Sequence, residues 1–166
     1  MADADGPEDE DGEVAPMAGE RGPRAVAGED RKPPVEVELT WEGDLRFRGR
    51  AGRSPVVVDS DGAAGASPVQ SLALALAGCM SVDVVHILQR GRQPLRGLRA
   101  RLVAERASAD PHRLVRVSLR FTVTGDVPAD KVDRAIALSR EKYCSVWHSL
   151  RPDIEFTTSV EFARDQ

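Results

Sequence analysis

The chain has 166 residues, enough for one domain, and a formal net charge of −4 at neutral pH. Its 23 basic residues are spread along the sequence with few aromatic residues among them, so we expect no nucleic-acid partner. The acidic start has neither the basic nor the apolar region of a secretory signal. Because the sequence also holds just two cysteines, we expect a cytoplasmic protein with free thiols rather than a disulfide-stabilised secreted one.

The first 34 residues differ in composition from the rest of the chain. They contain ten acidic and four basic residues, no aromatic residue, and many glycines, prolines and alanines. Such a segment cannot bury enough apolar surface to offset the entropy lost on ordering. We therefore expect a disordered acidic tail over residues 1–34 and a folded domain over residues 35–166.

The domain begins with patterns typical of strands. Residues 35–42 alternate apolar and polar side chains, Gly43-Asp44 suits a turn, and residues 45–50 form the second arm of a hairpin. Residues 56–59 are a candidate third strand.

A long helix is predicted next. Ser67 is a good N-cap, Pro68 suits the first helical position, and Gln70 stands where a capping box needs a glutamate or glutamine. The helix should run to about residue 90, because Gly91 and Pro94 follow.

Two further strands, a second helix and a last strand complete the chain. Residues 98–107 and 114–125 alternate with period two, a helix of about 20 residues should end just before Pro152, and residues 154–162 alternate again. The order ββ(β)-α-ββ-α-β predicts an α+β fold, with an antiparallel sheet and two long central helices on one face.

The first helix is apolar on nearly all sides, although a single sheet can cover only one of them. A membrane span is disfavoured because Gln70, Asp83 and His86 interrupt the apolar run. A second copy of the chain is the simplest remaining cover, so we predict a homodimer and no membrane partner.

Cys79, Asp83 and His86 share one face of this helix, at spacings of four and seven residues. Three interpretations remain open: a buried thiol that only fills space, a metal site, and a reactive thiol. The absence of CxxC and HxxxH spacing argues against a metal, and no cofactor motif is present. A reactive thiol would need a guanidinium from elsewhere; the candidates are Arg46, Arg48, Arg50 and Arg53.

Cys144 falls in the second predicted helix, so each long helix carries one of the two cysteines. If the helices pack together, the thiols could approach closely enough to form a disulfide, which requires Cα atoms within about 7 Å. A peroxidatic and resolving pair would have this arrangement.

Three stretches carry a resemblance to a known family: "SPVQSLALALAGCMSVDVVHILQRGRQPL", "RFTVTGDVPADKVDRAIALSREKYCSVWHSLRP" and "EFTTSVEF". Together they resemble the OsmC/Ohr family, most of all its YhfA-like branch, over residues 35–163. The resemblance implies an intertwined α+β homodimer with two active sites at the interface.

The resemblance also implies a chemistry. Cys79 would attack a small organic hydroperoxide and become a sulfenic acid, Cys144 would resolve it to a disulfide, and an external dithiol would reduce that disulfide. In the catalytic branches an arginine and a glutamate orient the thiolate. Arg46 and Arg53 are the candidates here for the arginine.

Two positions depart from the catalytic pattern. Val69 stands where the glutamate would lie, and Cys144 is followed by Ser145 rather than proline. Gln70, beside Val69, is a candidate catalytic residue, because its amide can donate a hydrogen bond to an arginine's partner oxygen or to a peroxide oxygen. Because of the two departures, we keep an alternative, a non-enzymatic dimer that binds a small ligand or senses thiol oxidation. In either case the predicted pocket around Cys79 is lined by Asp83, His86, Tyr143 and Trp147.

Overall fold

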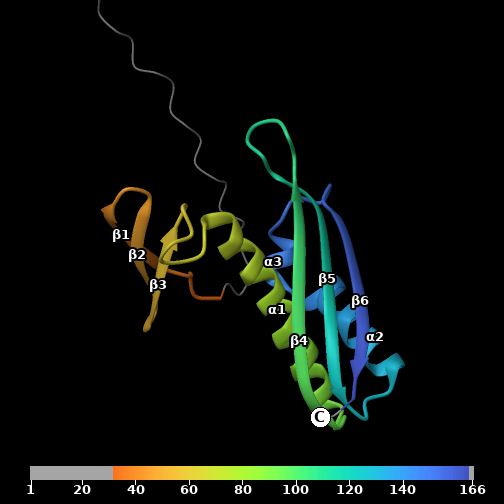
Figure 1. The fold of residues 1–166 in the computed structure, drawn as a ribbon. Helices are drawn as coiled ribbons and strands as arrows, with labels where there is room; N and C mark the ends of the chain where they lie inside the picture. The colour runs from red at the N-terminus through yellow and green to blue at the C-terminus, as the bar shows by residue number, and fades with distance from the viewer. Residues whose placement is uncertain (1–31, 165–166) are drawn as a thin grey trace, which may run out of the picture. The chain divides into compact units, whose positions relative to one another are not determined.

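The computed structural model describes residues 32–164, and all regular elements lie within the compact unit Glu36–Gln166. The predicted tail lies almost entirely outside the described residues. The α+β class and the order of elements are as predicted (Figure 1). The elements are β1 (Val37–Gly43), β2 (Arg46–Ala51), β3 (Ser54–Asp59), α1 (Pro68–Arg90), β4 (Leu95–Arg106), β5 (Leu114–Gly125), α2 (Ala129–Leu138), the π-helical turn η1 (Ser139–Tyr143), α3 (Ser145–His148) and β6 (Glu155–Ala163).

The strands form two three-stranded sheets, in the orders β1-β2-β3 and β4-β5-β6. The first sheet is antiparallel throughout, whereas in the second β5 pairs antiparallel with β4 and parallel with β6. The expectation of a purely antiparallel sheet is therefore wrong for β6. The reason is the connection: α2, η1 and α3 form a helical crossover between β5 and β6, which is the link that parallel neighbours require.

Helix α1 begins and ends where the sequence predicts. The Ser67 side chain accepts a hydrogen bond from the Gln70 backbone N–H (3.3 Å), and the Gln70 Oε1 accepts one from the Ser67 backbone N–H (2.8 Å). This reciprocal pair satisfies two donors that the first helical turn leaves open. One face of α1 is fully covered by the core, at four-residue spacing, through Leu76, Met80, Val84 and Leu88.

The second predicted helix is interrupted, so the expectation of one continuous helix of about 20 residues is wrong. The Cys144 backbone N–H bonds to the Ser139 carbonyl (2.8 Å), five residues back, and closes a π-turn in place of an α-turn. Cys144 itself is extended (φ −70°, ψ 92°) and is the N-cap of α3. A one-residue expansion of this kind leaves the apolar stripe nearly intact, so the sequence pattern does not reveal it.

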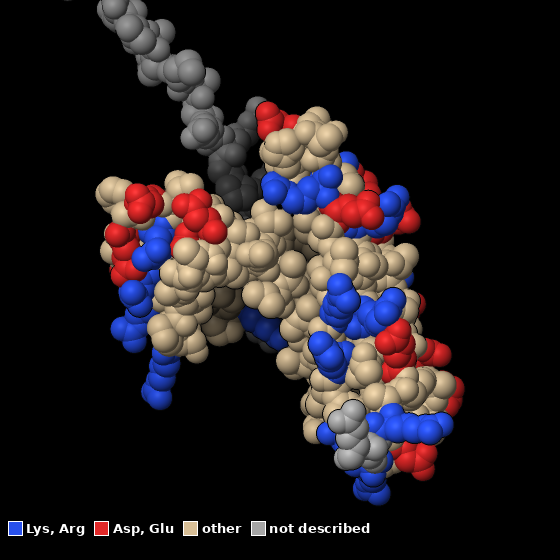
Figure 2. Space-filling model, viewed as in Figure 1, with Lys and Arg blue, Asp and Glu red and all other residues tan. Residues whose placement is uncertain are grey.

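Within residues 32–164, two apolar surfaces are not covered by other described residues. On the first sheet, alternate side chains are exposed on one face, including Leu39 (52%) and Trp41 (65%). On α1, Leu74 (64%) and Val82 (69%) are exposed on either side of Gly78, which is itself exposed. In Figure 2 the surface over α1 carries few charged side chains, whereas charged side chains of both signs lie over the first sheet and over β4–β6.

Helix α1 is also long and apolar enough to cross a membrane by length and composition, with 22% of its most apolar window buried. One face of α1 nevertheless packs in the core of the domain, and its Asp83 accepts a hydrogen bond from the Ser139 hydroxyl.

Candidate functional site

The two cysteines and one carboxylate meet between α1 and the end of η1. Among the described residues, Cys79 Sγ, Cys144 Sγ and an Asp83 carboxylate oxygen all lie within 4.8 Å of one another. Cys79 is partly exposed, whereas Cys144 is fully buried, and both are free thiols. The four-residue spacing of Cys79 and Asp83 stacks them on one face of α1, and the extended backbone at Cys144 brings its sulfur to that face.

Hydrogen bonds from neighbouring groups hold this cluster. The Ser139 hydroxyl, fully buried at the start of η1, donates to Asp83 Oδ2 at 2.7 Å. The Trp147 backbone N–H donates to Cys144 Sγ at 3.4 Å, as a helix N-cap interaction. Ser139 therefore fixes the carboxylate, and the first turn of α3 fixes the sulfur.

Burial dominates the acidity of Cys144 and raises its pKa from an ordinary 9.0 to about 12. The Trp147 N–H acts in the opposite direction, while Cys79 and the Asp83 carboxylate raise the pKa further. Near neutral pH Cys144 is therefore a thiol, and its proton must leave when it acts as a nucleophile.

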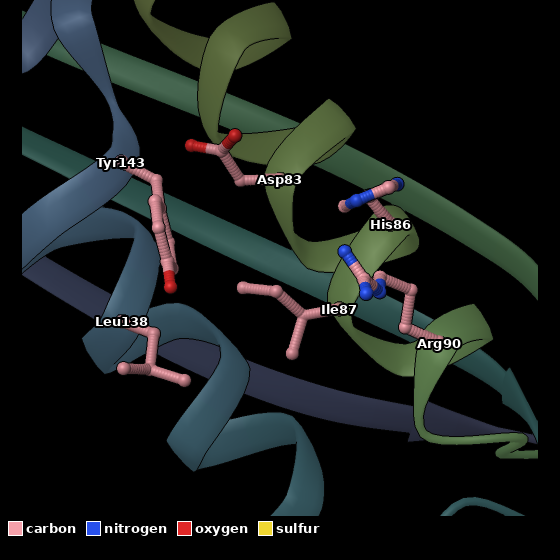
Figure 3. Close-up of a pocket in the computed structure, with 6 residues that line it drawn as sticks. All are labelled: Asp83, His86, Ile87, Arg90, Leu138 and Tyr143. Carbon is pink, nitrogen blue, oxygen red and sulfur yellow. The ribbon is translucent and has the colours of Figure 1, made fainter.

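A cavity of about 440 Å³ lies beside the cluster, between α1 on one side and α2 with η1 on the other (Figure 3). Three of the four predicted pocket residues, Asp83, His86 and Tyr143, line it together with Ile87, Arg90 and Leu138. The fourth, Trp147, packs instead on Phe156, with ring centroids 4.5 Å apart.

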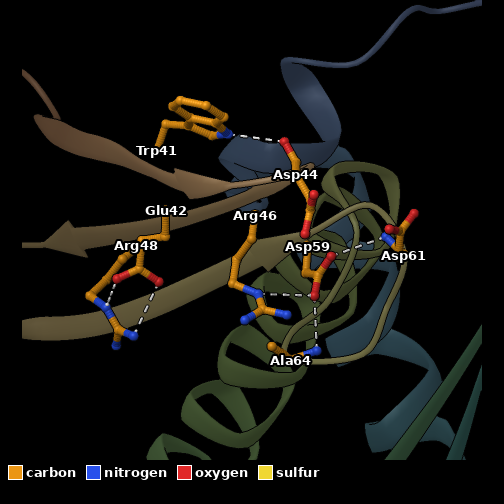
Figure 4. A network of polar contacts seen from close by, with 8 residues as sticks. All are labelled: Trp41, Glu42, Asp44, Arg46, Arg48, Asp59, Asp61 and Ala64. Atoms are coloured by element: carbon orange, nitrogen blue, oxygen red, sulfur yellow. Dashed lines mark hydrogen bonds and ion pairs between the residues drawn. The ribbon is translucent and has the colours of Figure 1, made fainter.

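Neither candidate arginine is bound to Cys79 within this chain. Arg46 Nε pairs with Asp59 Oδ2 at 3.4 Å (Figure 4). The nearly buried Asp59 also accepts the backbone N–H groups of Asp61 and Ala64, and chiefly the Ala64 bond holds the pKa of Asp59 below its usual value. Arg53 is exposed in the turn between β2 and β3.

Gln70 is occupied with the N-terminus of α1. Its side-chain oxygen closes the capping box, and nine residues separate it from Cys79. On an α-helix that spacing amounts to roughly 13 Å along the axis and about half a turn around it. Gln70 and Cys79 of one chain therefore lie on opposite sides of α1.

Ser139 is the residue that sequence reasoning missed at the site. The sequence places it within the second predicted helix, where a buried serine hydroxyl needs a hydrogen-bond partner. Its partner, Asp83, lies 56 positions earlier in the chain. The approach of Cys144 to Asp83 was also not predicted, because these two residues come from separate elements.

Comparison with known proteins identifies the family of this chain. The sequence profile described as "OsmC-like protein" matches residues 60–159. Protein YhfA of Escherichia coli K12 is 35% identical over 130 residues, which cover 76% of this chain and 97% of that protein.

Solved structures agree. A hypothetical protein from Aquifex aeolicus VF5 has a TM-score of 0.75 at 25% identity and covers 81% of this chain and 100% of its own. An organic hydroperoxide resistance protein from Elizabethkingia anophelis shares the fold, with a TM-score of 0.61, 14% identity, and coverage of 81% of this chain and 100% of its own. Sequence profile, sequence identity and fold agree, and the chain belongs to the OsmC-like family.

Proposed function

We propose that this protein is a thiol-dependent peroxidase that reduces small organic hydroperoxides. The observation that supports it most directly is the approach of two free thiols, one partly exposed and one buried, from separate elements of the fold. Structural relatives named as hydroperoxide resistance proteins support the same chemistry.

The proposed cycle has three balanced steps. The Cys79 thiolate attacks the hydroperoxide and the O–O bond breaks; Cys79 becomes a sulfenic acid, and the alkoxide takes a proton from water and leaves as an alcohol. The Cys144 sulfur then attacks the Cys79 sulfur, and its proton leaves with the hydroxyl as water while a disulfide forms. An external dithiol reduces the disulfide and restores both thiols. A dithiol pool of this kind favours the cytoplasm as the location.

We further propose that the working unit is a homodimer. The exposed apolar faces of the first sheet and of α1 both need a cover that the described part of this chain does not supply. A second copy presents the same two faces, as an isologous interface requires. The guanidinium that the Cys79 thiolate needs would then come from the β2–β3 region of the second copy, with exposed Arg53 the stronger of the two candidates.

A second function remains a candidate on specific grounds. Arg46 is paired with Asp59, Gln70 caps α1, and Val69 takes the place of the family's glutamate. Because Arg46 and Gln70 already have partners and Val69 has no polar group, the same site would suit a non-enzymatic dimer. Such a dimer would sense thiol oxidation or hold a small ligand in the cavity beside Asp83.

Peroxide consumption separates the two functions. Reduced protein is mixed with cumene hydroperoxide and excess dihydrolipoamide, and the remaining peroxide is measured over time. We expect many equivalents consumed per chain, and a Cys79–Cys144 disulfide in peptide maps of samples trapped without reductant.

Two variants assign the roles. Cys79→Ser should abolish consumption, whereas Cys144→Ser should still form a sulfenic acid that dimedone traps, at one per chain. Consumption limited to one equivalent in the native protein would favour the sensor, and no consumption above the Cys79→Ser control would refute the peroxidase.

A further inference from the structure

We propose that the reduced protein binds one Zn²⁺ ion per chain through Cys79 Sγ, Asp83 and Cys144 Sγ. This inference goes beyond the proposed peroxidase and does not depend on it, because it concerns the resting thiols rather than their reaction with a peroxide. It rests on the donor atoms, on their spacing and on the groups that hold them.

The spacing of the donors suits a tetrahedral ion. Zinc binds thiolate sulfur at about 2.3 Å and carboxylate oxygen at about 2.0–2.2 Å, so two sulfur ligands lie about 3.8 Å apart. All three donor atoms of the cluster already lie within 4.8 Å of one another. Rotamer adjustments of about an ångström would close the coordination sphere and leave a fourth position for water or another donor.

The chemistry of the donors selects the ion. Two thiol sulfurs are poor ligands for Mg²⁺ and Ca²⁺, which take oxygen, and good ligands for Zn²⁺. Zinc binding would displace the protons of both thiols to solvent, and the divalent cation would balance the negative charge of the resulting thiolates.

The neighbouring groups have the arrangement of an outer coordination shell. The Ser139 hydroxyl donates a hydrogen bond to Asp83 Oδ2 at 2.7 Å. The Trp147 backbone N–H donates to Cys144 Sγ at 3.4 Å. Hydrogen bonds to ligating carboxylates and sulfurs orient them toward a metal.

The cluster also has an entry path, because Asp83 lines the open cavity shown in Figure 3. Bound zinc would occupy both thiols, so zinc binding and the Cys79–Cys144 disulfide exclude each other. Zinc should therefore protect the thiols from oxidation, and oxidation should release zinc.

The test is a titration of the reduced, metal-free full-length chain with Zn²⁺ in competition with a chromogenic chelator, under anaerobic conditions. We expect one zinc per chain. Co²⁺ in place of Zn²⁺ should give a sulfur-to-cobalt charge-transfer band, which oxygen ligands alone do not produce. Adding hydroperoxide should release the metal in step with disulfide formation if the peroxidase also operates.

Variants assign the ligands. Cys79→Ser and Cys144→Ser each remove one sulfur ligand, so each variant should show a weaker cobalt charge-transfer band. Asp83→Asn should weaken metal binding about tenfold or more. Asp133→Asn removes an exposed carboxylate from α2 and is the matched control. Ser139→Ala keeps all three ligands and should weaken binding less, so it tests the cluster even if Asp83→Asn fails to fold.

The proposal is overturned if the chelator keeps all the zinc, or if binding is equal in native protein and the cysteine variants. The peroxidase is judged separately, by turnover of the metal-free protein. Turnover without zinc binding refutes the zinc site alone, and zinc binding without turnover refutes the peroxidase alone.

Discussion

At the scale of single residues, Cys144 owes its properties to its surroundings rather than to its neighbours in sequence. It is fully buried, accepts one backbone N–H, and lies beside a second thiol and a carboxylate. Burial outweighs the hydrogen bond, so the protonated form is favoured in the folded state. This has a measurable consequence for stability.

The native protein should lose stability at alkaline pH through Cys144. Folding raises its pKa to about 12, so between pH 9 and 12 the folded state holds a proton that the unfolded state has released. The stabilisation is complete below the unfolded pKa and is lost as pH rises toward the folded one. At pH 10 the loss should be on the order of 1 kcal/mol relative to pH 7.

Urea unfolding at pH 7 and pH 10 measures this loss. Cys144→Ala removes the titrating group, so its stability should fall less over the same interval, by on the order of 1 kcal/mol. Equal losses in the two proteins would show that Cys144 ionises as readily in the folded state as in the unfolded one.

At the scale of elements, α1 and the interrupted second helix each supply part of the cysteine site. Helix α1 supplies Cys79 and Asp83 on one face while its Leu76 to Leu88 face anchors it in the core. The π-turn η1 supplies Ser139 to Asp83 and ends at Cys144, whose extended backbone directs the sulfur to α1. π-turns are frequent at functional sites, and this one has a direct geometric role.

The capping box gives the prediction at this scale. Ser67→Ala should destabilise the protein by about 1 kcal/mol, because it removes an N-cap acceptor. Gln70→Ala should cost about 0.5–1 kcal/mol, through the single bond to the Ser67 N–H. Thermal or urea unfolding measures both.

Peroxide turnover of Gln70→Ala tests the alternative role of this residue. We expect an unchanged rate at temperatures where the variant is folded, since Gln70 lies half a turn from Cys79. A large fall in rate without a matching loss of stability would show that Gln70 takes part in catalysis. Gln70 of one chain would then act at the Cys79 site of the second copy.

At the scale of the whole molecule, the uncovered apolar surfaces are the dominant feature. The outer stripe of α1 has Gly78 at its centre, where nothing described lies within 4 Å of an added Cβ. A helix with a small residue at such a position lets another backbone approach closely. The proposed homodimer would use this stripe and the apolar face of the first sheet.

Val82→Glu tests the dimer. Val82 is 69% exposed on the α1 stripe, and a charge there should be tolerated by a monomer and rejected by an apolar interface. Light scattering should give twice the chain mass of 18.0 kDa for the native protein and a large shift toward one chain for the variant.

Val103→Glu is the matched control, because Val103 is 49% exposed on β4 among charged neighbours. It should leave the mass unchanged. A native protein of single-chain mass would refute the dimer outright, whereas a Val82→Glu variant that keeps a two-chain mass would show that the α1 stripe is not the interface.

The sequence by itself determined the α+β order, the bounds of α1 and the alignment of Cys79 with Asp83. These depend on local periodicity and on caps, which act over a few residues. Only the tertiary structure decided the parallel pairing of β6, the π-turn at Ser139, the pairing of Arg46 with Asp59 and the meeting of Asp83 with Cys144. Apart from the π-turn, each joins atoms from separate elements, and their approach depends on how those elements pack, which no local pattern records.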